Sequence, residues 1–286
     1  MKIWNEFYRP KNLDEMILPD DHRQAFKQYL SSGLPNVIFY GAPGTGKTTT
    51  ALILIKALAA EFLRLNGADE KNIDVVRETI KGFIQTKSFN SRKKIIFYDE
   101  AESILANSFM ALKEVTERYH KTASFIFCSN ALFKFPEAIR SRCTLFEFKK
   151  PIKADVLKFL KDVLDKEQVA FTPETLDTVY RSCGGDMRKS LNHLQRYSMS
   201  GKLEIPEETF GEIWKIIKGG TLVELKRYFA GNSVEFDGLY RFLFERVDDP
   251  TKAILLAKYA YQSTFCVDQE INFTGFVAEL QKLNNK

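Results

Sequence analysis

The chain has 286 residues, of which 44% are hydrophobic and 28% are charged, and its formal net charge is +5 at pH 7. These values exclude a disordered or fibrous protein and predict a soluble globular protein with one large or two to three small domains. No apolar run approaches the roughly 18 residues of a membrane span, and residues 1–6 lack a secretory signal, so we expect a protein of the cytoplasm or nucleus.

The four cysteines lie far apart in the sequence, with no Cys-x-x-Cys pair, and the chain has only three histidines. A structural zinc site needs about four such ligands at short spacing, so none is predicted. We expect Cys128, Cys143, Cys183 and Cys266 to be reduced and to act as small apolar side chains.

Five short apolar runs in the first part of the chain alternate with stretches of helical character. The runs at residues 37–40, 62–65, 95–98, 123–128 and 145–148 are predicted to be strands. Alternation of this kind predicts an α/β fold, in which a parallel sheet is covered by helices. Ligands of such sheets bind at the carboxyl ends of the strands, so we expect a site there.

The first predicted strand runs directly into Gly41-Ala42-Pro43-Gly44-Thr45-Gly46-Lys47-Thr48, and helical character follows over residues 51–63. A strand, a glycine-rich loop and a helix in this order predict a P-loop, whose backbone N–H groups and helix N-terminus bind phosphates. We expect this loop and Thr49 to bind ATP. Lys47 should reach the β- and γ-phosphates, and Thr48 should bind Mg²⁺.

An acidic motif closes the third predicted strand, where Tyr98 is followed by Asp99 and Glu100. Downstream of a P-loop, this pattern predicts that Asp99 binds Mg²⁺ through water and that Glu100 polarises the water that attacks the γ-phosphate. By itself, an apolar run followed by two acids is also typical of a solvated strand end. The P-loop upstream favours the catalytic interpretation.

The fourth predicted strand ends at Ser129-Asn130. An amide side chain at this position can orient the attacking water or contact the γ-phosphate. A turn-forming asparagine, which is common at strand ends, is the alternative. The order of the motifs favours a catalytic role for Asn130.

Strand signals stop after Pro151, and apolar residues recur at helical spacing from there to the C-terminus. Thr172 and Pro173 are predicted to begin a helix that Gly184-Gly185 ends. A composition change near residue 205 separates two helical regions. We therefore predict three domains, at residues 1–150, 151–205 and 206–286.

Further groups of residues lie outside these motifs. They are Trp4-Asn5-Glu6-Phe7-Tyr8-Arg9-Pro10 with Leu13-Asp14-Glu15, Leu65-Asn66-Gly67-Ala68-Asp69-Glu70 with Asp74-Val75-Val76-Arg77, Ser141-Arg142-Cys143, and Gly185-Asp186-Met187-Arg188-Lys189. In order and spacing they resemble the boxes of the replication factor C small subunits, which are AAA+ ATPases of sliding-clamp loaders. The resemblance extends from residue 4 to about residue 197. In its length the chain resembles the large subunit of T-even bacteriophage clamp loaders, for which the location would be the host cell cytoplasm.

The resemblance implies an AAA+ fold in which the second predicted domain is a helical lid and the third is a collar that joins subunits. Arg142 is then an arginine finger, which reaches from one subunit into the ATP site of the next to neutralise the transferring phosphoryl group. Arg188 is then a lid arginine that contacts the nucleotide phosphates. Tyr8-Arg9-Pro10 and Ile17 are implied to flank the adenine.

The chain departs from the family pattern in two places. Relatives often carry paired arginines after the acidic motif, whereas this chain has Lys113 followed by Glu114. Because lysine lacks the planar fork of arginine, Lys113 is expected to make a weaker or differently aimed intersubunit contact. The acidic motif ends in Glu102 rather than in aspartate, which leaves Asp99 and Glu100 unchanged.

DNA contact is implied on the inner surface of a spiral of such subunits. The candidates for binding backbone phosphates are Arg77, Lys81, Arg92 and Lys93. Contacts of this kind predict little sequence preference and a strong salt dependence. An ordinary charged surface is the alternative for each of these residues.

The resemblance implies an ATPase motor subunit that opens a sliding clamp and loads it onto primer–template DNA, with ATP and Mg²⁺ as cofactors. Four copies of this chain and one distinct subunit are the expected assembly. An AAA+ protein remodeller is a second interpretation, but residues 66–70 lack the aromatic-hydrophobic-glycine loop that such proteins usually carry. A scaffold without hydrolysis is a third, and the intact P-loop and Glu100 disfavour it.

Overall fold

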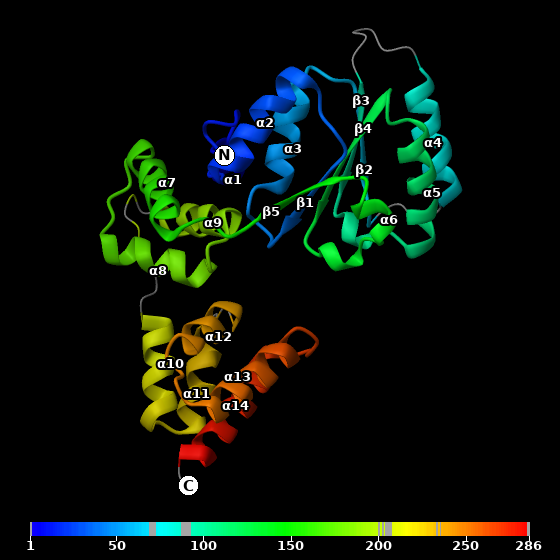
Figure 1. The fold of residues 1–286 in the computed structure, drawn as a ribbon. Coiled ribbons are helices and arrows are strands. Elements are labelled where there is room, and N and C mark those ends of the chain that lie inside the picture. Colours follow the sequence, from blue (N-terminus) through cyan, green and yellow to red (C-terminus); the bar gives the residue numbers. More distant parts are fainter. Residues whose placement is uncertain are drawn as a thin grey trace. The chain divides into compact units, whose positions relative to one another are not determined.

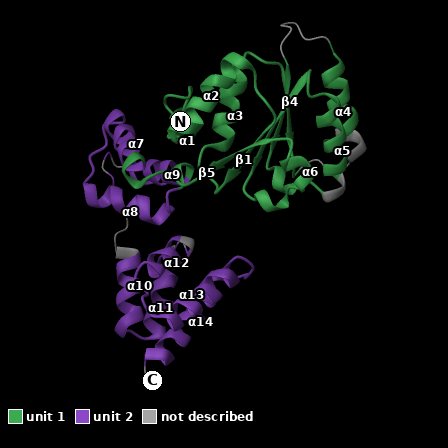
Figure 2. Ribbon diagram, viewed as in Figure 1, with its two compact units in different colours: residues 1–155, 186–188 green, residues 156–185, 189–286 purple. Residues whose placement is uncertain are grey.

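Figure 1 shows the fold in a computed structural model, which describes residues 2–68, 73–86, 93–199, 201, 203, 208–232, 234 and 236–284. The chain forms two compact units. One consists of Met1–Asp155 and Asp186–Arg188, and the other of Val156–Gly185 and Lys189–Lys286 (Figure 2). The division into three domains, with boundaries near residues 150 and 205, stays a prediction.

The first unit contains a five-stranded sheet. Its strands are β1 (Val37–Gly41), β2 (Phe62–Asn66), β3 (Lys94–Asp99), β4 (Ala123–Ser129) and β5 (Thr144–Phe148), in the spatial order β2-β3-β4-β1-β5. The strand pairs are parallel throughout this order. The parallel α/β sheet predicted from the alternation of apolar runs is therefore confirmed.

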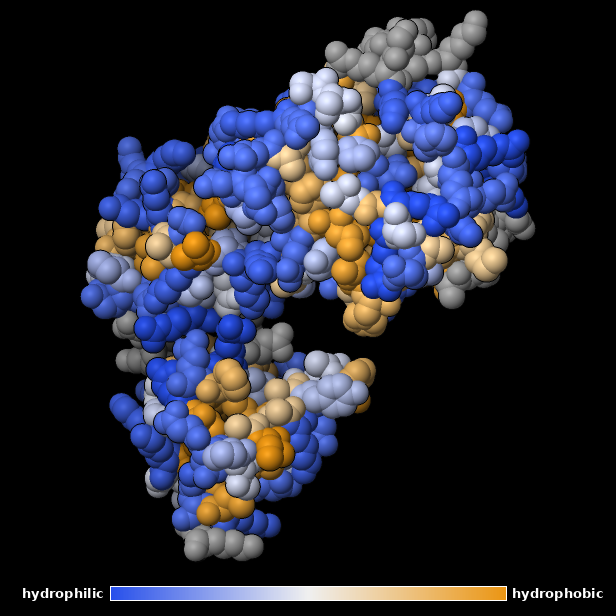
Figure 3. Space-filling view, in the orientation of Figure 1, coloured by the Kyte–Doolittle hydropathy of each residue, from blue (hydrophilic) through white to orange (hydrophobic). Residues whose placement is uncertain are grey.

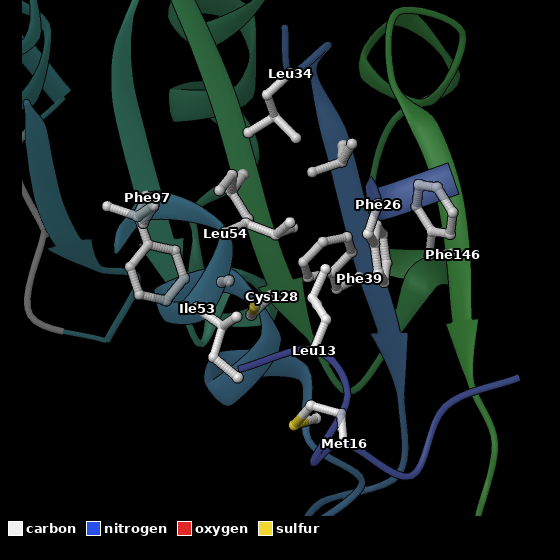
Figure 4. Packing of buried hydrophobic residues seen from close by; sticks show 14 of the residues in the cluster. Leu13, Met16, Phe26, Leu34, Phe39, Ile53, Leu54, Phe97, Cys128 and Phe146 are labelled. Atoms are coloured by element: carbon white, nitrogen blue, oxygen red, sulfur yellow. The ribbon is translucent and has the colours of Figure 1, made fainter. Parts of the chain in front are cut away.

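Helices cover both faces of the sheet (Figure 1). Alternate residues of a strand point to opposite faces, so each face has its own apolar core. One core joins the strands to α2 (Asp20–Ser32) and α3 (Lys47–Ala57), and within it the ring centroids of Phe26, Phe39 and Phe146 lie 4.7 to 5.8 Å apart (Figure 4). The other core joins the strands to α4 (Ile73–Gln85), α5 (Ala106–Arg118) and α6 (Glu137–Arg140).

Helix α3 begins and ends earlier than the helix predicted over residues 51–63. Lys47 is its first residue, and the preceding Gly46 has a left-handed conformation with φ 99° that ends the loop. The helix ends at Ala57, and Ala59 has a φ of 46°, through which no right-handed helix continues. The predicted C-terminal part was wrong, because residues 62 and 63 pair with β3 as part of β2.

The described residues beyond β5 lie mostly in helices. These are α7 (Lys153–Lys166), α8 (Pro173–Cys183), α9 (Met187–Tyr197), α10 (Glu208–Gly219), α11 (Leu222–Gly231), α12 (Phe236–Phe244), α13 (Pro250–Ser263) and α14 (Gln269–Asn284). Helix α8 begins as predicted, since the Thr172 side chain accepts a hydrogen bond from the N–H of Thr175, and Gly184 with φ 59° follows its last residue. No helix in the described ranges is long and apolar enough to cross a membrane.

Helices α10 to α14 enclose a separate apolar core with an aromatic centre. Phe273 has no solvent exposure, and its ring lies 5.4 to 6.0 Å from those of Phe229, Phe236, Tyr240 and Phe276. Such a core stabilises the helices through buried apolar area and ring contacts. Elsewhere on both units, hydrophobic patches interrupt a largely hydrophilic surface (Figure 3).

Candidate nucleotide-binding site

The predicted P-loop connects β1 to α3 at the carboxyl end of the sheet (Figure 1). Because the strands are parallel, the ends of β3 and β4 lie at the same edge, and residues far apart in the sequence meet there. The first N–H groups of α3 have no partner within the helix and are available to an anion. The site predicted at this edge is therefore built from three separate segments.

Close packing against the P-loop requires two of its glycines. A Cβ atom on Gly44 would lie 2.1 Å from the Asp186 carboxylate, and one on Gly46 would lie 2.7 Å from the Met16 side chain. Both glycines also have a positive φ, 71° at Gly44 and 99° at Gly46, which residues with a side chain rarely adopt. A larger residue at either position would strain the backbone and require the Asp186 or Met16 side chain to move.

Lys47 is buried within the P-loop, and three oxygens share its ammonium group. Its Nζ atom donates to the carbonyl oxygens of Gly41 and Ala42 and to Oδ1 of Asn130, each at 2.8 Å. Burial lowers the pKa of the Lys47 amine, and neighbouring acidic groups oppose this effect. The loop thus holds a buried cation at the position where a P-loop needs one.

Thr48 and Asp99 lie side by side at the start of α3. Thr48 Oγ1 donates to Asp99 Oδ1 at 3.0 Å, and the other carboxylate oxygen accepts a hydrogen bond from Arg64 of β2 at 2.8 Å. The residues predicted to bind metal are therefore together in space. Arg64 has no role in the sequence prediction, although it is the one charged residue in the apolar run 62–65, a signal that could have singled it out.

Glu100 follows β3 in a left-handed backbone conformation, with φ 50° and ψ 41°, and it is exposed. This conformation is uncommon for a residue with a side chain and is concentrated at functional sites. It ends the strand and begins the short helix η1 (Ala101–Ser103), in which Ala101 is fully buried. Strand β3 therefore places Asp99 next to Thr48, and the turn after β3 sets the position of Glu100.

Asn130, directly after β4, joins Lys47 to a second carboxylate. It donates twice to Glu102 of η1, from Nδ2 to Oε1 at 2.6 Å and from its backbone N–H to Oε2 at 3.0 Å. Glu102 has no role in the sequence prediction. Its place three residues after Asp99, which is one turn of a 3₁₀-helix, is the signal that could have indicated it.

Two N-terminal segments lie against the P-loop. Arg9 donates from Nε to Thr49 Oγ1 at 3.0 Å, so the Tyr8-Arg9-Pro10 segment, which follows α1 (Trp4–Phe7), reaches the start of α3. Ile17 is half-buried next to Met16, the residue that packs on the loop. The structure thus brings Arg9 to the start of α3, and the contact of Tyr8, Arg9, Pro10 and Ile17 with a base stays a prediction.

Arg188 belongs to the short segment Asp186–Arg188, which is part of the first unit. Asp186 Oδ1 accepts the backbone N–H of Arg188 at 2.9 Å at the start of α9, and Arg188 is exposed. Because Asp186 also packs against Gly44, the segment that carries Arg188 lies at the P-loop. Contact between Arg188 and phosphates stays a prediction.

Arg142, predicted to act on a neighbouring subunit, follows α6 and is partly exposed. Its guanidinium forms an ion pair with Glu117 of α5 and donates to the Ala138 carbonyl at 2.6 Å and to Ser141 Oγ at 3.2 Å. These partners belong to α5, α6 and the turn after α6. A partly exposed ion pair is worth about 0–1 kcal/mol, so the side chain is available to a stronger partner.

The residues predicted to bind DNA fall on separate parts of the first unit. Arg77 and Lys81 lie about one turn apart on α4. Arg77 pairs with Glu114 of α5, and Lys81 Nζ lies 3.3 Å from Glu78 Oε1. These two basic side chains therefore share one side of α4.

Lys93 and Lys113 lie elsewhere on the first unit. Lys93 precedes β3 and donates to the His120 carbonyl at 3.0 Å, while Lys113 is half-buried on α5. Arg92 lies outside the described residues. The DNA contacts of these residues and the intersubunit contact of Lys113 stay predictions.

The residues around Lys47 and Asp99 fit a magnesium nucleotide. The loop presents glycines, free N–H groups and a buried ammonium, which together suit a polyphosphate. The Thr48 hydroxyl and the Asp99 carboxylate, 3.0 Å apart, are hard oxygen ligands of the kind that Mg²⁺ prefers alongside phosphate oxygens and water. The geometry of the loop supports nucleotide binding, and binding of Mg²⁺ by Thr48 and Asp99 is a separate inference.

Comparison with known proteins agrees with this site. Residues 37–151 match the family described as "ATPase family associated with various cellular activities (AAA)". The chain is 36% identical over 242 residues to the replication factor C small subunit of Archaeoglobus fulgidus, covering 82% of this chain and 76% of the relative. It is 30% identical to replication factor C small subunit 1 of Pyrobaculum islandicum, covering 99% and 95%. The fold resembles the RuvB Holliday junction branch migration motor of Thermotoga maritima, with a TM-score of 0.58 at 16% identity over 82% of this chain and 88% of that one.

Proposed function

The chain belongs to the replication factor C small-subunit family of AAA ATPases, and we propose that it is the clamp-loader motor that opens a ring-shaped clamp and places it on primer–template DNA. The observation that carries this proposal is a pair of hydrogen bonds at the P-loop. One joins Lys47 to Asn130 and the other joins Thr48 to Asp99, so three segments of the chain meet there. An ATPase needs these groups at one place.

ATP would bind with its phosphates on the P-loop. Lys47 would exchange its carbonyl partners, Gly41 and Ala42, for phosphate oxygens, which are stronger acceptors for an ammonium group. Thr48 and Asp99 would hold Mg²⁺, which when bound neutralises charge on the β- and γ-phosphates. The Tyr8-Arg9-Pro10 segment and Ile17 would flank the base.

Hydrolysis requires a water aligned with the γ-phosphate. Glu100, placed by the turn that ends β3, would polarise this water, and Asn130 would help to position it. The left-handed conformation of Glu100 supports this role, since strained backbone is concentrated at functional sites. Catalysis in phosphoryl transfer rests mainly on such positioning and on charge stabilisation.

A further positive charge at the phosphates would come from a neighbouring subunit. Arg142 would leave its weak pair with Glu117 and contact the phosphates bound to the next protomer. Arg188 would contact phosphates within its own protomer, which would couple nucleotide state to a helical lid at residues 151–205. Hydrolysis would therefore require assembly, through a collar at residues 206–286.

The partners follow from the family. The chain works in a multi-subunit clamp loader with the clamp and DNA, and we expect four copies with one distinct subunit. Arg77, Lys81, Arg92 and Lys93 would bind DNA phosphates, so affinity should fall steeply with salt and depend little on sequence. Lys113 would add a weaker contact between subunits.

One experiment tests the proposal. The full chain is purified with its partner subunit, and ATP hydrolysis is measured alone, with the matching clamp, with primed DNA and with both. We expect slow turnover alone and a strong rise when clamp and primed DNA are both present. Equal turnover in all four conditions would refute clamp loading, and a lone monomer that hydrolyses ATP at full rate would refute the shared site.

A further inference from the structure

Glu102 is the last residue of the acidic motif, and the roles assigned to Asp99 and Glu100 leave it without one. It stands on η1, three residues after Asp99, and both of its oxygens accept hydrogen bonds from Asn130. One bond comes from the backbone N–H and the other from the side-chain amide, so the carboxylate fixes both the strand end and the side chain attached to it. Glu102 is half-buried and Asn130 is exposed, and both bonds gain strength because the acceptor is charged.

The two sides of the Asn130 amide are chemically distinct. Nδ2 lies 2.6 Å from a Glu102 carboxylate oxygen, where only a donor is favourable. Oδ1 lies 2.8 Å from the Lys47 ammonium, where only an acceptor is favourable. Reversing the amide would place oxygen against oxygen on one side and N–H against ammonium on the other. The carboxylate and the lysine therefore select one orientation of the amide.

This orientation separates the two roles open to Asn130. A γ-phosphate oxygen is an acceptor, so direct contact with it requires an N–H of Nδ2, and Glu102 takes one of the two that Nδ2 carries. The atom that faces Lys47 and the P-loop is the amide oxygen. An oxygen in this place accepts a hydrogen bond from Lys47 or from a water molecule and repels a phosphate.

We propose that Glu102 is a positioning residue that holds Asn130 with its amide oxygen toward the P-loop, so that Asn130 aligns the attacking water as an acceptor. This inference rests on the proposed ATPase function and deepens it. Glu102 does not touch the substrate. It acts through Asn130, and its charge also stabilises the Lys47 ammonium through the polarised amide between them.

The test is Glu102→Gln in the full chain. Glutamine has the same shape as glutamate, but only one of its two terminal atoms is an acceptor. If the glutamine oxygen accepts from the Asn130 backbone N–H, its NH₂ group faces Asn130 Nδ2 and cannot accept a hydrogen bond from it. The Asn130 amide then turns, and its NH₂ group faces Lys47. We expect single-turnover hydrolysis of ATP to slow about tenfold to hundredfold, the range expected when a reacting group is misplaced by about 1 Å. We expect affinity for a fluorescent ATP analogue to change by less than about threefold, since the phosphate contacts of the loop are intact.

Three further variants make the result specific. Glu102→Asp keeps an acceptor and should retain more activity than Glu102→Gln. Asn130→Ala should slow hydrolysis, and adding Glu102→Gln to it should cost nothing more, because Glu102 acts through Asn130. Glu224→Gln is the matched control, since Glu224 accepts a backbone N–H of Thr221 at 2.7 Å in the helix cap of α11.

Two outcomes would overturn the inference. If Glu102→Gln hydrolyses ATP as fast as the wild type or faster, the amide orientation does not matter or the donor is the active group. If the losses from Glu102→Gln and Asn130→Ala multiply in the double variant, Glu102 does not act through Asn130. All rates are measured on the chain assembled with its partner subunit, without clamp or DNA, so failure of clamp stimulation would refute the loader function and leave the comparison of these variants valid.

Discussion

The P-loop edge of the sheet and the core of α10 to α14 are stabilised in different ways. At the sheet edge, polar groups that range from buried Lys47 to exposed Asn130 satisfy one another, as in the contacts of Lys47 with Asn130 and of Asn130 with Glu102. In the helical core, Phe273 and the rings around it stabilise the helices mainly through buried apolar area, and the Tyr240 hydroxyl accepts a hydrogen bond from Asn272. The polar groups can bind and react with a ligand but bury little apolar area, whereas the aromatic groups bury much apolar area and have no reactive role. Substitutions in the two regions should therefore separate activity from stability.

Arg142→Ala should give the largest effect and should act on activity alone. Loss of an arginine finger slows phosphoryl transfer by about 10³-fold or more, and we expect this loss in the assembled complex. The thermal midpoint of the chain should be nearly unchanged, because the pair with Glu117 is partly exposed. The measurement is ATP turnover with clamp and primed DNA, and Arg181→Ala, which removes an exposed pair with Asp177, is the control. Wild-type turnover of the assembled variant would exclude the finger.

Glu100→Gln should slow hydrolysis about 10²- to 10⁴-fold, the range for loss of a group that polarises water or moves a proton. ATP should still bind, because the P-loop is untouched, and the clamp-bound state should accumulate. Single-turnover hydrolysis and nucleotide affinity are measured on the same preparation. Glu137→Gln, at an exposed carboxylate on α6, is the control for loss of a carboxylate. Normal hydrolysis in Glu100→Gln would remove Glu100 from its role.

Phe273→Ala should reverse this pattern. Truncating a fully buried phenylalanine costs about 3–5 kcal/mol of folding free energy, and we expect the helical core to unfold at lower denaturant while the P-loop still binds nucleotide. Denaturation followed by circular dichroism is compared with binding of an ATP analogue. Phe265→Ala, at a side chain that is 74% exposed, should cost less than about 0.5 kcal/mol. A parallel loss of nucleotide affinity would show that the two regions are not independent.

Alkaline pH should give a smaller effect that originates in the first unit. Burial raises the pKa of Cys143 from 9.0 to about 12, with Arg142 opposing. The unfolded thiol loses its proton near pH 9 while the folded thiol keeps it, so stability should fall as the pH rises from about 9 to about 12. The slope is at most about 1.4 kcal/mol per pH unit for this one group. Urea denaturation at several pH values should show a shallower decline in Cys143→Ala, and an unchanged decline would assign it to other buried groups.

Much of the fold was predictable because its signals are local. Apolar runs of strand length, separated by helical patterns, indicated a parallel sheet, and each predicted strand is present. The predicted end of the helix over residues 51–63 was wrong. Residues 62 and 63 fit both the helical and the strand pattern, and only their pairing with β3 shows that they belong to a strand. The limits of elements depend on tertiary partners more than their existence does.

The site divides in the same way. Lys47, Thr48 and Asp99 were predictable because the P-loop and the acidic motif are short stretches whose chemistry depends on neighbouring residues. The contact between Lys47 and Asn130 joins residues 83 positions apart, and it was expected only because parallel strands end at one edge. Arg64 was not predicted as a member of the site, since a single charged residue in an apolar run carries no motif. Glu102 was recognised as the end of the acidic motif, but its partner Asn130 lies 28 residues further along the chain, so no role could be assigned to it.

The amino-acid sequence by itself therefore determined the secondary elements, the phosphate-binding loop and the family, because these depend on local propensity, periodicity and spacing along the chain. The tertiary structure alone decided that Arg64 pairs with Asp99 and that Glu102 accepts two hydrogen bonds from Asn130. Hydrogen bonds require donor and acceptor atoms within about 3 Å, and only folding brings residues of separate strands to that distance.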